Sequence, residues 1–195
     1  MANFVVRISE KTMLTFYKLL FQLILSPAQG WSDISYASVP ERRLASVGMY
    51  PLLAVTGLTI LLKGVYHPGS ETWTVLIERA IVEFVKFFVC YYVAVFFFSS
   101  YIHRFSDAEP SEKRVHTFVI FTISQLALMN LLENCLPIDL TVIGFLAIYV
   151  AVVMLRGVRY MAVRPDKVES FMIFAVSTVI LPCYLLGWLF NILFF

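Results

Sequence analysis

The C-terminal stretch 170–195 reads SFMIFAVSTVILPCYLLGWLFNILFF and contains no Asp, Glu, Lys or Arg over 26 residues. A helix needs about 20 mostly apolar residues to cross the roughly 30 Å of hydrocarbon in a bilayer. The stretch 170–195 is at least twice as long as a strand in a membrane barrel, and polar and apolar residues do not alternate along it. This stretch therefore predicts a membrane-spanning helix.

Four more charge-free runs precede it, at 44–62, 87–103, 115–132 and 140–155. The chain is 60% hydrophobic and 14% charged, whereas a soluble domain is about 45–50% apolar and about a quarter charged. An ordinary soluble enzyme, a disordered tail and a disulfide-rich secreted module are thereby excluded. We expect an all-α integral membrane protein with five transmembrane helices, at 43–63, 78–102, 114–135, 138–160 and 170–194.

The positive charges predict the orientation of these helices. If five helices alternate in direction, 12 of the 15 Lys and Arg residues fall on the side of the N-terminus. Because Lys and Arg accumulate in cytoplasmic loops, we expect a cytoplasmic N-terminus and an exterior C-terminus.

The segment 1–42 is expected to be a cytoplasmic N-terminal unit ahead of the membrane domain 43–195. Within it, 11–25 (KTMLTFYKLLFQLIL) places Lys11, Thr15, Lys18 and Gln22 on one helical stripe and apolar residues on the rest. A helix of this length is too short to cross, and a basic amphipathic helix lies flat in the interface. The alternative is a cleaved signal peptide, but Lys18 is close to the apolar core and Ser26-Pro27-Ala28 is a poor cleavage site.

Several polar residues are predicted at membrane depth near the exterior side. Arg79, Glu83 and Lys86 share one helix face, and a charge at the bilayer centre normally faces a bundle interior or water. We expect a cluster between the second, third and fourth transmembrane helices in which Lys86 or Arg79 pairs with Glu133. Either a substrate, ion or partner site or a set of interhelical ties would explain it. Its candidate members are Arg79, Glu83, Lys86, Gln125, Asn130, Glu133 and Asp139.

A second candidate set consists of basic residues on the cytoplasmic side. Near a membrane surface each such charge favours anionic headgroups by about 1 kcal/mol. The expected anionic-lipid contacts are Lys11, Lys18, Arg42, Arg43, Arg156, Arg159, Arg164 and Lys167.

Motifs for catalysis and for metal or cofactor binding are not found in the sequence. It contains no P-loop, no G-x-G-x-x-G and no H-E-x-x-H, and its three cysteines have no ligand spacing. A net charge of +2 does not suggest nucleic-acid binding. We therefore expect a non-enzymatic protein with neither metal nor cofactor.

Three stretches resemble the Yip family of Ypt/Rab-interacting membrane proteins and their bacterial relatives. They are Leu25-Ser26-Pro27 followed by Trp31 and Ile34, the run Val115–Leu136 with Pro137, and Leu146–Gly157 (LAIYVAVVMLRG) followed by Pro165-Asp166-Lys167. The resemblance implies a five-helix, non-enzymatic membrane protein. The chain lacks the long polar N-terminal region of eukaryotic members, which favours a bacterial-type member of the inner membrane.

The leading functional expectation is a membrane-organising or partner-binding protein. Its partners would be the bilayer, anionic cytoplasmic lipids, and another membrane protein or a second copy of the chain. The alternative is a small transporter or channel that uses the polar cluster around Glu83, Lys86 and Glu133. A water-filled cavity past Lys86 would favour transport, and a closed bundle with paired charges would favour the first expectation.

Overall fold

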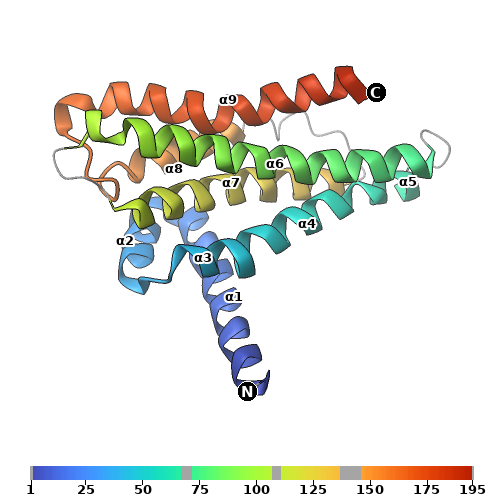
Figure 1. Ribbon diagram of the computed structural model, residues 1–195, viewed down its shortest axis with the longest axis horizontal. Helices are drawn as coiled ribbons and strands as arrows, with labels where there is room; N and C mark the ends of the chain where they lie inside the picture. Colours follow the sequence, from blue (N-terminus) through green and yellow to red (C-terminus); the bar gives the residue numbers. More distant parts are fainter. Residues whose placement is uncertain (1, 67–71, 107–110, 137–145, 195) are drawn as a thin grey trace.

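The computed structural model describes residues 2–66, 72–106, 111–136 and 146–194, with side chains from Thr12 onward (Figure 1). In this part of the chain all regular elements are helices. Four helices are long and apolar enough to cross a bilayer: Glu41–Tyr66, Trp73–Arg104, Glu112–Cys135 and Pro165–Phe194. The prediction of an all-helical chain with membrane-spanning helices is confirmed, and these four coincide with four of the five predicted spans.

The bundle is built around helix α7. Its main helices run side by side in Figure 1 and are α4 (Tyr50–Thr59), α6 (Trp73–Tyr101), α7 (Glu112–Cys135), α8 (Leu146–Arg156) and α9 (Val168–Phe194). Helix α7 packs against the other four. The most apolar stretch of its span is 67% buried, against 28% for the last span. Helix α7 therefore forms the core, and α9 presents most of its surface to the surroundings.

The first span is composed of four helical segments. These are α3 (Glu41–Arg43), the π-helix η1 (Leu44–Met49), α4 and α5 (Leu61–Tyr66). Pro51 lies just after η1. In an α-helix its ring would clash with the carbonyl of Val47 and its backbone could not donate a hydrogen bond. The wider turn of a π-helix relieves this conflict, so the sequence interrupts the α-helix immediately before the proline.

Two helices precede the bundle, α1 (Ala2–Leu25) and α2 (Pro27–Ala37). The segment predicted as 11–25 is helical but longer, and α2 was not predicted. Pro27 starts α2 at a position where its missing N–H costs nothing, and Ser38 ends it in a left-handed conformation. Helix α1 runs steeply across the direction of the bundle helices (Figure 1).

Helix α1 uses part of its apolar surface against the protein itself. Phe16, Leu20 and Leu23 are fully buried, and the Phe16 ring stacks on Phe121 of α7 with centroids 5.4 Å apart. Leu14, Phe21 and Leu25 are 66%, 54% and 81% exposed. The single apolar face expected for 11–25 is therefore divided into a docked side and a free side. One hydrophobic core extends from α1 and α2 into the bundle.

Helix α8 ends at Arg156, four residues before the predicted end at 160. The predicted start of this helix, 138–145, lies outside the described residues. After α8 the chain turns through Ala162, which has φ 53°. The Ser106 hydroxyl donates to the Ala162 carbonyl at 2.8 Å, and the Arg164 amide donates to the Phe105 carbonyl at 2.9 Å. The two connections at this end of the bundle are thereby tied together.

Candidate functional site

A polar pocket of about 440 Å³ opens between α5, α6, α7 and α9. Glu83 and Lys86 come from α6, Asn130 from α7 and Gly187 from α9. The sequence predicted that this cluster lies between the second, third and fourth helices. In the described part of the chain, the first and last spans contribute instead of α8.

Glu83 is at the centre of the contacts in this pocket. Its Oε1 atom lies 2.7 Å from the Lys86 ammonium, one turn along the same helix. The Asn130 amide donates to the same oxygen at 2.6 Å and so links α7 to α6. A carboxylate that accepts from both a cation and an amide keeps its charge compensated in a mostly apolar setting.

Lys86 is 8% exposed. The aliphatic part of its side chain packs against α9 at Gly187, which has no side chain. A Cβ atom added to Gly187 would lie 3.4 Å from the Lys86 Cδ. The Lys86 ammonium pairs with Glu83, whose i,i+3 spacing favours an intrahelical contact, and not with Glu133 as one of the two expected pairings had it. The other expected pairing, Arg79 with Glu133, stays a prediction.

The structure brings together most of the predicted cluster. Arg79, Glu83, Lys86, Asn130 and Glu133 line one pocket. Gln125 does not; it is 1% exposed in the α7 core, and its amide has no hydrogen-bond partner among the described residues. Asp139 lies outside the described residues.

Three more polar residues line the pocket: Lys63, Asn134 and Asn191. The sequence placed Lys63 at the exterior end of the first span without assigning it to the cluster, and it did not single out Asn134 or Asn191. The Asn134 amide donates to the Thr56 carbonyl at 3.4 Å and thereby ties α7 to α4. Asn191 is the last polar residue in the apolar run 170–195, and this isolated position could have identified it as a candidate.

The bundle interior beyond Lys86 is filled by side chains. Cys90, Ala94 and Phe98 follow Lys86 along α6 and are fully buried. The Phe98 ring contacts Phe118 with centroids 5.6 Å apart and Phe171 at 6.0 Å. The polar pocket therefore ends at Lys86, and an aromatic core separates it from the opposite end of the bundle.

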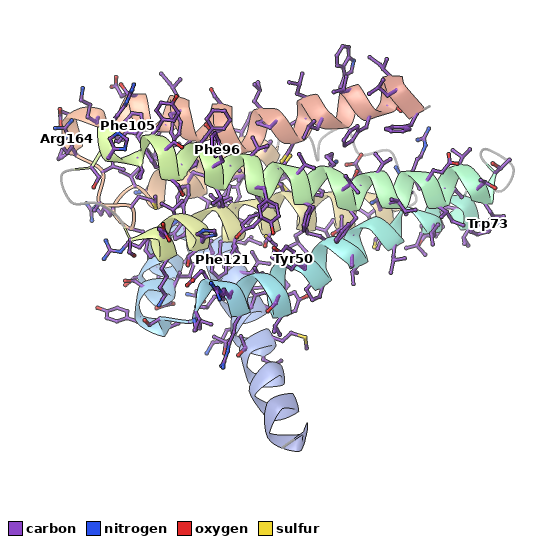
Figure 2. The ribbon with its side chains drawn as sticks, in the orientation of Figure 1. Tyr50, Trp73, Phe96, Phe105, Phe121 and Arg164 are labelled. Carbon is purple, nitrogen blue, oxygen red and sulfur yellow. The ribbon has the colours of Figure 1, made fainter. Side chains whose placement is uncertain are left out.

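The predicted lipid-contacting residues gather at that opposite end, which Arg164 marks in Figure 2, whereas Trp73 marks the pocket end. Arg42 and Arg43 are exposed on α3, and Lys18 is exposed on α1. The side chain of Lys11 lies outside the described part of the chain. The other members lie at or after the end of α8: Arg156, Arg159, Arg164 and Lys167.

Trp31 attaches the α1–α2 pair to this basic end. Its indole N–H donates to the Val153 carbonyl at 2.8 Å. Its ring stacks between Phe118 and Tyr160, with centroid distances of 5.1 and 5.2 Å. Tyr149 adds a hydrogen bond from its hydroxyl to the Ile24 carbonyl. A tryptophan so enclosed contributes a large buried area and a satisfied polar group.

The same contacts join two stretches that lie far apart in the sequence. Trp31 belongs to the N-terminal one, and Tyr149, Val153 and Gly157 belong to the other. Gly157 packs directly against the Trp31 and Phe118 rings. Residues far apart in the sequence thus form one docking site for α2.

Among the described residues, no group of three or more His, Cys, Asp or Glu side chains is placed to hold a metal ion. Cys90, Cys135 and Cys183 are free thiols. No model of a known protein family matches the chain, and no match is found among curated proteins or solved structures.

Proposed function

We propose that the chain is a non-enzymatic, five-span membrane protein of the Yip-like, bacterial type, which organises the bilayer on its cytoplasmic side through helix α1. In this proposal 138–160 forms the remaining crossing, the N-terminus is cytoplasmic, and the membrane is the bacterial inner membrane. Helix α1 lies in the interface as an amphipathic helix.

The observation that carries the proposal is the attachment of α1. Phe16 and Trp31 hold the α1–α2 pair against the bundle, so α1 crosses the direction of the spans at their basic end. Its other side exposes Leu14, Phe21 and Leu25. Fully burying one such side chain is worth about 1.5–3 kcal/mol, so three partly exposed ones favour insertion by several kcal/mol.

An amphipathic helix inserted in one leaflet responds to membrane curvature and lipid composition. Many amphipathic helices reach the membrane from solution, whereas α1 is fixed to a spanning bundle. The protein would therefore stay in the membrane and would redistribute towards regions where the cytoplasmic leaflet is convex. Arg42, Arg43 and Lys18, all exposed at this end, would add attraction to anionic lipids.

The proposal is tested by curvature sorting. Fluorescent full-length protein in giant vesicles should be several-fold denser on a pulled membrane tether than on the flat membrane. Leu14→Gln with Phe21→Gln should remove the enrichment, because it takes away the free apolar side of α1. Tyr36→Gln, at an 85% exposed site on α2, is the matched control and should keep it. Equal enrichment of all three proteins would contradict the proposal.

Transport remains a second candidate because the pocket around Glu83 and Lys86 is polar and open to one side. The aromatic core beyond Lys86 favours the first proposal over transport. Flux across liposomes into which the wild type or Glu83→Gln has been reconstituted separates the two. A flux that Glu83→Gln abolishes supports transport, and no flux for a panel of ions and small solutes counts against it.

A further inference from the structure

A second pocket, of about 670 Å³, lies at the basic end between α2, the start of α7 and the segment after α8. Three arginines line it, Arg114 from α7 and Arg156 and Arg159 from the end of α8 and the turn that follows. Trp31, Tyr160 and the hydroxyl groups of Ser32 and Ser35 form the rest of its polar wall. Arg114 was not among the predicted lipid contacts.

The pocket carries an uncompensated positive charge. Its lining contains no acidic side chain. Neither the ion pair of Lys86 with Glu83 nor that of Arg164 with Asp166 includes a pocket arginine. Three neighbouring guanidinium groups repel one another unless an anion lies between them.

The frame that holds the arginines is rigid. Trp31 is 3% exposed and is fixed by its hydrogen bond to Val153 and by its stacking on Tyr160. The arginine side chains are exposed but project from backbone that the Trp31 contacts hold in place, so their charges converge on one opening.

We propose that this pocket binds a phosphate-bearing anion with at least two negative charges, such as the headgroup of a phospholipid with two phosphates. Arginine forks bind phosphate oxygens in pairs, and serine hydroxyls supply further donors. The volume exceeds what one phosphate fills and lies within the range of ligand pockets, about 300–1,000 Å³. Basic pockets between membrane helices on the cytoplasmic side bind dianionic headgroups.

This proposal rests on the proposed function in one respect, namely that the basic end of the bundle lies among lipid headgroups. Binding itself requires neither curvature nor helix α1 in the interface. A binding experiment in detergent micelles therefore tests the pocket alone, and tether sorting tests the proposed function alone.

Trp31 provides the readout. The chain has three tryptophans, and Trp73→Phe with Trp188→Phe leaves Trp31 as the only one. Titration of this full-length protein with cardiolipin should give a saturable change in Trp31 emission. The affinity should be at least tenfold higher than for phosphatidylglycerol, which carries a single charge.

Matched double variants separate a site from general attraction. Arg156→Gln with Arg159→Gln should weaken cardiolipin binding at least tenfold. Arg42→Gln with Arg43→Gln removes the same charge from the same end but outside the pocket lining, and should change binding less than twofold. Equal weakening by both pairs, or no saturable change in any protein, would overturn the proposal.

Two further arms complete the test. The first applies if the glutamine variant does not fold, as judged by its Trp31 emission without lipid. Arg156→Lys with Arg159→Lys keeps the positive charges but loses the forked contacts of the guanidinium groups. This variant should still weaken cardiolipin binding several-fold, and unchanged binding would overturn the proposal.

Competition with pyrophosphate identifies the source of the anion. Displacement of cardiolipin by micromolar pyrophosphate supports a soluble phosphate ligand, and displacement only at millimolar concentration supports a lipid headgroup.

Discussion

Gly157→Ala should loosen the α1–α2 pair from the bundle while the middle of α6 stays intact. Gly157 follows the last residue of α8 and faces the two rings that dock α2. A Cβ atom there would lie 2.7 Å from the Phe118 Cε2 and 2.8 Å from the Trp31 Cε2. Favourable contacts between carbon atoms are about 3.5–4.0 Å, so one ring must move by about 1 Å.

Neither ring can move freely. Trp31 is held by Val153 and Tyr160, and Phe118 is packed against Phe98. Overpacking of a well-filled core costs about 1–3 kcal/mol. At about 1.4 kcal/mol for each factor of ten, the equilibrium constant for opening of the hairpin should rise by roughly 5- to 150-fold.

Hydrogen exchange of the α2 amides in detergent micelles measures this opening. Protection over 30–35 should fall by that factor in Gly157→Ala, while amides in the middle of α6 keep theirs. Gly187→Ala is the control, because its Cβ would meet only the flexible Lys86 chain at 3.4 Å and alanine favours a helix over glycine by about 1 kcal/mol. Protection of α2 within twofold of the wild type in Gly157→Ala would show that close packing at Gly157 does not hold α2 on the bundle.

Another prediction concerns the buried ion pair of Glu83 and Lys86. Glu83→Gln leaves the buried Lys86 without its counter-ion at 2.7 Å. This loss should cost about 3–5 kcal/mol of folding free energy and lower the thermal unfolding temperature by several degrees. Adding Lys86→Met should restore most of the lost stability, and an unchanged unfolding temperature in Glu83→Gln alone would contradict the pairing.

The membrane-spanning helices could be predicted because charges mark their ends. Lys63 and Arg104 stop two charge-free runs close to where the observed spans end. The division of the first span into α- and π-helical segments was not predictable in detail. Pro51 signalled an irregularity, but its position relative to the neighbouring helices decided how the backbone accommodated it.

Helix α2 was missed because its sequence, PAQGWSDISYA, mixes small, polar and apolar residues and gives no long apolar run. Trp31 becomes a docking residue only when α7 and α8 supply Phe118 and the Val153 carbonyl. Such partners depend on tertiary packing, which local periodicity does not report.

The polar cluster could be predicted in composition but not in its contacts. Glu83 and Lys86 shared a face by spacing alone, and this spacing also allowed the intrahelical pair that forms. The contribution of α9 through Gly187 and Asn191 depends on which helices are neighbours. Gln125 shares a face with Glu133 in sequence but lies two turns deeper, where α7 is enclosed on all sides.

We propose that α1 lies in the membrane interface with its free apolar side in the hydrocarbon. Spin labels placed singly at Leu14, Phe21, Thr15 and Gln22 of the full-length protein in anionic liposomes test it through their accessibility to oxygen and to a water-soluble nickel chelate. Labels at Leu14 and Phe21 should favour oxygen, approaching a lipid-facing control at Leu181, and labels at Thr15 and Gln22 should favour the chelate. Four labels equally accessible to the chelate would show that α1 projects into water and does not lie in the membrane interface.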